Sequence, residues 1–570
     1  MVANGKPGEW NELRALARRL RPLAARGVLQ HFYLAPTLPQ APLSHREVLD
    51  TWLSFAADAR MTPQPLHLYL HIPFCAHKCR YCIYHSQGDF DPRDLSAYLK
   101  RLHAELDAYR EFGASRSCDT FYLGGGTPTV LSERQLESLL ERVHRHFRFR
   151  PGGERAFECN PLSLTPAKAR LFARFGLNRA SFGVQTLRRT TLSGCNRGYQ
   201  TERMVRRCIE ALRAERFFVN ADLIHGLDDG SLAELARTAR RLLDFGVTQI
   251  TVYSLSPYTP EGVGRARGLP MDELGRSLAE RAELAEMNIR AHPTALGIAR
   301  PDHSDNLLDE EGKRAGRLVL YSDANPDPFS LLGLGPSARG SVFGRLRYQF
   351  LPYPAATPFS PGGRLAVGRF LEPDEEQRRY VVGQLEDAGA LSPARYREHF
   401  AESLQARFGR QLGLLRRAGW LERGPRGYVL CVRDPVERFA ACLAFVSKPM
   451  RRAVRAQANA PSPTERSSPK TPRPSGAGAG RRLRLQDPQG VTLEVELVAA
   501  AADRPVFFGC AGLGFFVPGN DFRPDSKQSR LLERFCRLFA RAARHAPGDV
   551  DALARRLLDA RDAALSVRGA

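Results

Sequence analysis

The sequence predicts an α/β protein built around a partial barrel of parallel β-strands, with further domains on either side. Two observations lead to this fold class. From about residue 66 to residue 256, short apolar runs alternate with amphipathic helical stretches, which is the pattern of βα units. At 570 residues the chain is also longer than one hydrophobic core supports, so the barrel accounts for only part of it.

Six apolar runs are the strand candidates, and helical runs near residues 94–112, 133–147, 166–175, 200–215 and 231–245 separate them. Thr165 stands before Pro166, and acidic residues follow Ser132; both patterns are typical of helix N-termini. Right-handed crossovers would turn six such units into a (β/α)6 barrel, short of the closed eight-unit form. A doubly wound open sheet is the alternative. The six runs are LHLYLHI, DTFYLGG, ERAFECN, RASFGVQ, FFVNADLI and TQITVYSL.

Composition divides the rest of the chain. A helix, a proline-punctuated arm and a second helix form an N-terminal arm, and a helical stretch that ends in "GWLERGPRGYVL" predicts a winged-helix-like module. A Pro/Ser/Gly-rich stretch predicts a disordered linker, and a small accessory α+β domain of unknown role follows it. The predicted segments are the arm 1–65, the barrel 66–256, a barrel extension 257–365, the helical domain 366–450, the linker 451–483 and the accessory domain 484–570.

Charge and hydropathy argue against several classes of function. There is no secretory signal and no run of about 18 apolar residues, so we expect a cytoplasmic protein without a membrane span. The net charge of +23 is spread along the chain, mostly as arginine, and forms no stripe interleaved with aromatics. We therefore expect no nucleic-acid partner and a monomer, and we note that a basic protein also suits an anionic small molecule.

Three of the 11 cysteines lie within eight residues, in "CAHKCRYC". Cys75, Cys79 and Cys82 directly follow the first predicted strand, at the end where barrels place their active sites. With His77 or His85 they could form a Cys3His zinc site. Alternatively, three thiolates leave one iron of a four-iron cluster open to a small molecule, and the position at a strand end favours this interpretation.

Polar and glycine residues follow the other predicted strands. Gly124, Gly125 and Gly126 carry no side chains, so backbone groups can approach a ligand, and Thr127 adds a hydroxyl. Side chains at or near the ends of three further strands could converge on the same ligand, where they would suit a ribose diol, an amine or a sulfonium, and Arg197 could pair with a carboxylate. The three are Glu158, Gln185 and Asp222.

At this point the sequence resembles a known family. C-x3-C-x2-C after the first strand is similar to the signature of the radical S-adenosylmethionine (SAM) superfamily, and "LYLHIPFC" resembles its HemN/HemW-like group. That group includes the oxygen-independent coproporphyrinogen III oxidase. Six further segments resemble the group in order: FYLGGGTPTVL, FECNP, SFGVQT, GCNRGY, NADLIHGL and LLGLGPSARG. The resemblance covers about residues 65–345 and extends through the helical stretch to about 450.

The resemblance implies a site and a chemistry. Cys75, Cys79 and Cys82 would ligate a [4Fe-4S] cluster, and the strand-end residues would bind SAM, as one or two molecules. Tyr69 resembles a catalytic tyrosine beside the cluster. Reductive cleavage of SAM would give a 5′-deoxyadenosyl radical that attacks a porphyrin- or heme-type substrate, with electrons from a donor such as flavodoxin or ferredoxin.

The sequence leaves the reaction open within the group. HemN-type decarboxylases carry a further cysteine where this chain has Tyr84, which puts coproporphyrinogen oxidation in doubt. HemW-like heme chaperones lack that cysteine too, but they begin almost directly at the first strand. HemN-like methyltransferases have an aromatic pair after the third cysteine, and Tyr84–His85 matches it in part. We expect a radical SAM oxidoreductase, with heme carriage and methyl transfer as alternatives.

Overall fold

The structure is a computed structural model in which eighteen segments can be described. Statements about the structure below refer to these residues. They are 7–19, 41–58, 64–82, 84–88, 90–225, 227, 232–254, 291–292, 304–308, 328–352, 357–372, 374–387, 389–432, 434–452, 481–486, 492–498, 507–510 and 513–516.

The six predicted strands form the centre of one large sheet, and each pairs in parallel with the next in chain order. Since the order is sequential, every right-handed crossover places its helix on the same face, and the doubly wound alternative is wrong. The predicted partial barrel is confirmed. Its strands are β2 (Leu66–Ile72), β4 (Thr120–Gly125), β6 (Arg155–Cys159), β7 (Arg179–Gln185), β8 (Phe218–His225) and β9 (Gln249–Ser254).

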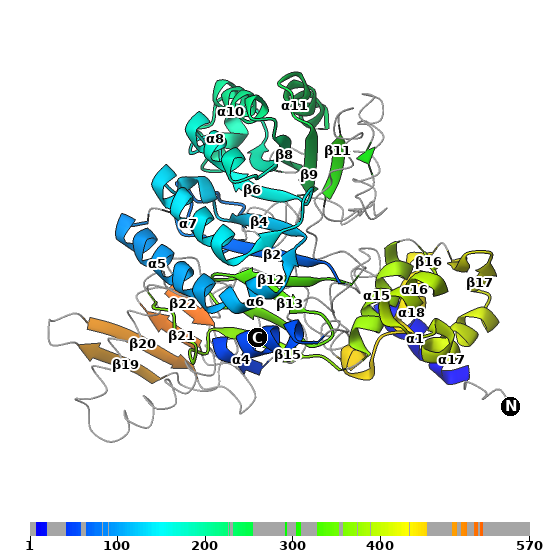
Figure 1. Cartoon of the computed structure of the whole chain (residues 1–570). Coiled ribbons are helices and arrows are strands. Elements are labelled where there is room, and N and C mark those ends of the chain that lie inside the picture. The colour runs from blue at the N-terminus through cyan, green and yellow to red at the C-terminus, as the bar shows by residue number, and fades with distance from the viewer. Residues whose placement is uncertain are drawn as a thin grey trace.

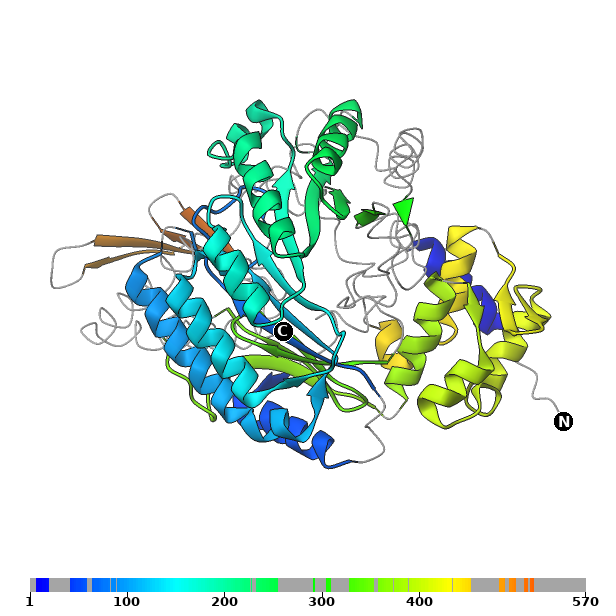
Figure 2. The ribbon, with the colours of Figure 1, turned by 45° about the horizontal axis from the view of Figure 1, so that its top comes forward.

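The connecting helices cover the outer face of these strands, where Figure 2 shows them coloured blue to green. Two predicted starts are confirmed: Ser132 forms a capping box with Gln135, and Thr165 accepts a hydrogen bond from the Lys168 amide. The helix faces and the strands share one continuous apolar core, in which Phe157 stacks on Phe172. The helices are α5 (Pro92–Ala108), α7 (Glu133–His146), α8 (Pro166–Arg174), α10 (Glu202–Ala214) and α11 (Leu232–Asp244).

The sheet continues beyond the six strands at both edges. Beside β2, strand β12 (Ser330–Leu334) adds a seventh parallel strand, which the sequence pattern did not predict. An antiparallel run follows: β13 (Arg339–Val342), β14 (Leu346–Phe350), β15 (Ala366–Phe370) and β1 (Ala41–Leu43). At the far edge, β11 (Ser304–Leu308) and β10 (Ala291–His292) pair antiparallel to β9.

The helical domain has its own core and a three-stranded sheet, in agreement with the winged-helix-like prediction. Residues 366–370 form β15 of the large sheet, and the first helix after them, α15, begins at Glu375. Helix α1 (Pro7–Arg19) packs into this core, with Arg14 paired to Glu437 at 3.1 Å, and Figure 1 shows it among these helices. The elements are α15 (Glu375–Asp387), β16 (Ala390–Leu391), α16 (Pro393–Phe400), α17 (Leu404–Arg417), β17 (Leu421–Gly424), β18 (Gly427–Leu430) and α18 (Pro435–Leu443).

The C-terminal segment contributes a four-stranded antiparallel sheet. Its strands are β19 (Arg481–Gln486), β20 (Thr492–Val498), β21 (Phe507–Cys510) and β22 (Leu513–Phe516). Apart from these strands, the predicted accessory domain lies outside the described residues, as does most of the predicted linker. The domain boundaries therefore stay predictions. Among the described helices, none is long and apolar enough to cross a bilayer.

Candidate functional site

The three clustered cysteines lie on a loop that leaves the carboxyl end of β2. The Cys75 amide donates to the Gln87 carbonyl at 2.9 Å, and the Gln87 amide donates to the Pro73 carbonyl at 2.7 Å, so the loop is closed at its base. The turn after helix α9 (Arg189–Gly194) holds the loop's middle, where the Arg80 amide donates to the Cys195 carbonyl at 3.3 Å. The cysteine-bearing segment is thus anchored at both ends.

The thiols have polar neighbours that suit anionic sulfur. Thr127 Oγ1 donates to Cys75 Sγ at 3.4 Å, and Arg197 Nη1 donates to Cys79 Sγ at 3.5 Å. Burial raises the pKa of Cys75 and of Cys82, which keeps the free thiols protonated. A bound metal centre would replace those protons and remove that penalty.

The geometry does not favour zinc. Among the described residues, no three His, Cys, Asp or Glu side chains are placed to hold one metal ion. Of the two candidate fourth ligands, His77 lies against Tyr199 with ring centroids 4.9 Å apart, and His85 stacks near His71. Zinc needs all its ligands about 2.0–2.3 Å from one point, whereas a four-iron cluster is held by thiolates spread around a larger body.

The glycine segment at the end of β4 is packed tightly against the cysteine loop. Gly125 has φ +113°, and a Cβ there would lie 2.8 Å from His71 Nδ1. A Cβ on Gly126 would lie 2.5 Å from the Phe74 carbonyl oxygen. The amides of Gly126 and Thr127 donate to the carbonyls of Ile72 and Phe74, both at 2.7 Å. The glycines therefore allow the ends of β4 and β2 to approach each other. Their amides form hydrogen bonds within the protein.

Two buried acidic side chains, Glu158 and Asp222, lie on different strands and interact electrostatically. Glu158 accepts from Tyr122 Oη and from the Gly125 amide, both at 3.0 Å, and Asp222 accepts from Ser181 and Asn220. Burial, and then the Asp222 charge, raises the pKa of Glu158 to about 7, while burial raises the pKa of Asp222 to about 6. A cationic ligand would favour the ionised form of these two carboxyl groups, and a hydroxyl-bearing ligand could hydrogen-bond to them.

Gln185 and Arg197 meet at the end of β7. Gln185 adopts φ +69°, beside a register shift of β7, and its Oε1 is buried without a hydrogen-bond partner in the described part of the chain. A strained backbone that presents an unsatisfied buried oxygen indicates a ligand contact. Arg197 is 3% exposed, and its Nη2 donates to the Gly183 carbonyl at 2.5 Å and to Gln200 at 2.6 Å. Its Nε has no partner among the described residues.

Two tyrosines flank the site in different ways. Tyr69 contacts His71 at 3.0 Å through its hydroxyl and stacks beside Tyr122 with centroids 6.0 Å apart. Tyr84 is 64% exposed, yet its surroundings and then the Glu158 charge raise its pKa to about 12. The accessible area and the raised pKa agree if the ring stands in an opening surrounded by protein. The exposed Tyr84 side chain can therefore meet a ligand.

Sequence reasoning missed several residues of this arrangement. Tyr122 and Tyr81 hold Glu158 and Arg197, since the Tyr81 hydroxyl lies 3.5 Å from Arg197 Nη1. Alternation along β4 could have placed Tyr122 on the same face as Gly124. No local sequence signal marks Lys78, whose ammonium turns into the cysteine loop.

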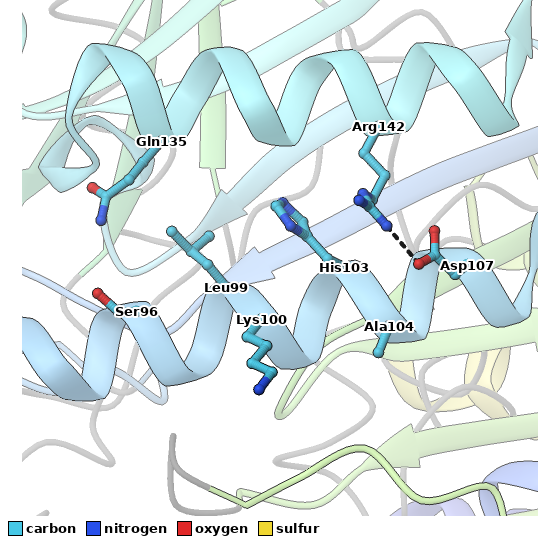
Figure 3. A pocket seen from close by; sticks show the side chains of 8 residues that line it. All are labelled: Ser96, Leu99, Lys100, His103, Ala104, Asp107, Gln135 and Arg142. Atoms are coloured by element: carbon cyan, nitrogen blue, oxygen red, sulfur yellow. Dashed lines mark hydrogen bonds and ion pairs between the residues drawn. The ribbon is translucent and has the colours of Figure 1, made fainter.

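A pocket on the outer side of the protein is separate from this site. Figure 3 shows it between α5 and α7, with the Arg142–Asp107 ion pair at one end. None of the predicted site residues lines it. Its lining residues are Ser96, Leu99, Lys100, His103, Ala104, Asp107, Gln135 and Arg142.

Comparison with known proteins identifies the family. The sequence model of the Radical SAM superfamily matches residues 69–242, which hold the cysteine loop and all the residues described at the strand ends. This part of the chain is a radical SAM domain of the HemN/HemW-like group. Radical SAM proteins use a [4Fe-4S] cluster and SAM, and these are the cofactors of this protein.

Named relatives come from two functional classes. The chain is 28% identical over 368 residues to the oxygen-independent coproporphyrinogen III oxidase of Pseudomonas aeruginosa, covering 60% of this chain and 78% of that one. It is 28% identical over 311 residues to the same enzyme of Cereibacter sphaeroides, covering 53% and 67%. It is also 31% identical over 242 residues to heme chaperone HemW of Mycobacterium tuberculosis, covering 41% and 61%.

A solved structure shares the fold. HemN of Escherichia coli superposes with a TM-score of 0.55 at 22% identity, over 71% of this chain and 94% of that one. The residues of this chain fit the cofactors of the group. The Arg197 guanidinium contacts the Cys79 thiol, and Arg197 Nε and Gln185 Oε1 are both buried without a partner among the described residues.

Proposed function

We propose that Cys75, Cys79 and Cys82 ligate the cluster and that SAM binds along the ends of β4, β6, β7 and β8. The observation that carries this proposal is Arg197. It contacts Cys79 Sγ with Nη1 and is fixed by Gly183 and Gln200 through Nη2, while its buried Nε has no partner among the described residues. A buried guanidinium so arranged would bind a carboxylate directly beside the cysteine loop.

The other site residues have distinct roles in this proposal. Glu158 and Asp222 would accept hydrogen bonds from the amine and ribose hydroxyls of SAM, and Gln185 Oε1 would accept one more. The glycines would hold the β4 end against β2, and Thr127 would orient Cys75. Tyr69 would present its hydroxyl oxygen to the reacting ligands. When bound, the cluster and SAM supply a 5′-deoxyadenosyl radical for hydrogen abstraction.

We propose a tetrapyrrole as substrate and a coproporphyrinogen III oxidase-like oxidation as the reaction. The support is the family membership, the net charge of +23, which suits several carboxylates, and the exposed Tyr84 ring near Glu158. A flat aromatic side chain offers a stacking surface to such a ligand. Arg339 contributes a positive charge near the Tyr84 hydroxyl and could pair with a substrate carboxylate.

A HemW-like heme carrier is the second candidate. It is favoured by Tyr84, which stands where HemN-type decarboxylases carry a cysteine, and by the 31% identity to a HemW protein. A HemN-like methyltransferase fits the Tyr84–His85 pair. An electron donor of the flavodoxin or ferredoxin type, a monomeric state and a cytoplasmic location remain predictions.

One assay separates these functions. The reconstituted, reduced protein is incubated with SAM and either coproporphyrinogen III or heme. Oxidised coproporphyrinogen with 5′-deoxyadenosine supports the oxidase, and S-adenosylhomocysteine with a modified tetrapyrrole supports methyl transfer. Tight heme binding without cleavage above background supports the carrier and contradicts the enzymatic proposal.

A further inference from the structure

Lys78 lies between the first and second cysteines, and its ammonium is hydrogen-bonded to the returning half of the cysteine loop. Nζ donates to the Tyr84 carbonyl at 2.5 Å and to Ser86 Oγ at 2.8 Å. These acceptors lie six and eight residues further along, beyond the third cysteine. A single side chain thus ties the first half of the loop to its returning half.

The backbone of Lys78 is fixed from the opposite side. Asn196 Nδ2 donates to the Lys78 carbonyl at 2.9 Å. The returning chain also packs closely, since a Cβ on Gly88 would lie 3.1 Å from the Lys78 amide nitrogen. A free lysine side chain keeps most of its rotamers, and ordering it has an entropic cost. The ordered Lys78 side chain must therefore form interactions that offset this loss of entropy.

The ammonium is also electrically close to the sulfur ligands. Ser86, whose hydroxyl accepts from Lys78, is 7% exposed. Lys78 directly precedes Cys79, and its ammonium reaches residues that follow Cys82, so it spans the cysteine-bearing part of the loop. The positive charge is therefore held within the loop that carries the three sulfurs, where Coulomb interactions are stronger than in bulk water.

We propose that Lys78 is a positioning residue that clasps the cluster loop and supplies a fixed positive charge that makes the cluster easier to reduce. Reduction adds one electron, and thus one negative charge, to the centre. A nearby ammonium stabilises the reduced form more than the oxidised form. The inference rests on the proposed function, which places the cluster on Cys75, Cys79 and Cys82.

The test is the cluster's midpoint potential, measured by titrating reconstituted protein with dithionite and following the reduced cluster by electron paramagnetic resonance. Lys78→Met removes charge and clasp, Lys78→Gln keeps N–H donors without the charge, and Lys78→Arg keeps the charge. Lys100→Met removes an exposed charge from the outer side of α5 and is the matched control.

We expect the Met and Gln variants to have more negative midpoints, so that at the wild-type midpoint several-fold less cluster is reduced. The Arg and Lys100→Met variants should stay near wild type. Loss of iron in Lys78→Met alone would show that the Lys78 hydrogen bonds hold the cluster loop together. The midpoint of Lys78→Gln would then test the effect of the charge. Equal midpoints for wild type and Lys78→Gln would overturn the charge role. If the wild type itself takes up no iron and sulfide, the proposed function fails, which is a separate result.

Discussion

The hydroxyl of Tyr69 lies 3.0 Å from Nδ1 of His71, and Nε2 of the same ring lies 3.0 Å from the His85 carbonyl oxygen. Because a carbonyl oxygen can only accept, Nε2 carries the ring proton, and Nδ1 accepts from Tyr69. Burial lowers the pKa of His71 to about 4, so the ring is neutral at physiological pH. His71 therefore accepts from Tyr69 and fixes the direction of its hydroxyl.

We expect Tyr69→Phe to retain its iron and to form 5′-deoxyadenosine about 10- to 100-fold more slowly, because the oriented oxygen is lost. The measurement is product formation by reconstituted protein with excess reductant. Tyr109→Phe is the control, since the Tyr109 hydroxyl is buried and unpaired among the described residues. A Tyr69→Phe variant with the wild-type rate would show that Tyr69 is only a core aromatic.

Arg197→Lys should weaken SAM binding by about 10- to 100-fold. Lysine keeps the charge but loses the fork that joins Gly183, Gln200 and Cys79, and it leaves buried acceptors unpaired. Equilibrium binding of SAM to reconstituted protein measures the effect. Arg206→Lys, on the exposed face of α10, should bind like wild type. Unchanged affinity in Arg197→Lys would remove this residue from the proposed carboxylate contact.

Glu105→Gln should remove a pH dependence of folding stability. Burial raises the pKa of Glu105 to about 7 from its ordinary 4.5. Between these values the folded protein keeps a proton that the unfolded chain releases, so this group's contribution is complete below about pH 4.5 and is lost as pH rises through 7. At pH 8 the variant should be more stable by roughly 1–3 kcal/mol.

Urea unfolding at pH 5.5 and pH 8 measures that difference. Glu137→Gln, on the exposed side of α7, should change with pH as wild type does. If Glu105→Gln keeps the wild-type difference between the two pH values, Glu105 titrates normally and the buried site is wetter than its 1% exposure indicates.

Tyr84→Ala should separate SAM cleavage from substrate conversion. The side chain is 64% exposed, so its removal should leave the cysteine loop folded and its iron content unchanged. We expect tetrapyrrole conversion to fall about 10-fold while 5′-deoxyadenosine formation without substrate stays within about twofold, since a stacking surface is lost. Equal conversion by both proteins would place the substrate elsewhere.

Much of the barrel could be predicted because its signals are local. The apolar run of β2, the capping residues Ser132 and Thr165, and the helix periods all lie within a few residues of what they specify. Strand β12 could not be found this way. Ser330–Leu334 is an ordinary apolar run, and only the folded chain shows that it pairs with Leu66–Leu70, more than 200 residues earlier.

The candidate site divides in the same way. Spacing and strand ends selected the cysteines, Glu158 and Asp222, whereas side-chain directions depend on distant contacts. Nothing near Arg197 in sequence shows that its guanidinium points back to Cys79, 118 residues earlier. Likewise, Glu105 follows a helical pattern, but its burial depends on Gly335 and on His45 in α4 (His45–Ala56).

The cluster itself is the most direct test of the central claim. Protein reconstituted without oxygen with iron and sulfide should bind about four of each per chain and show a visible charge-transfer band. With dithionite and SAM it should release 5′-deoxyadenosine, and Cys75→Ala should lose both the band and the product. A purified protein that holds zinc, with no iron or sulfide after reconstitution, would contradict the account.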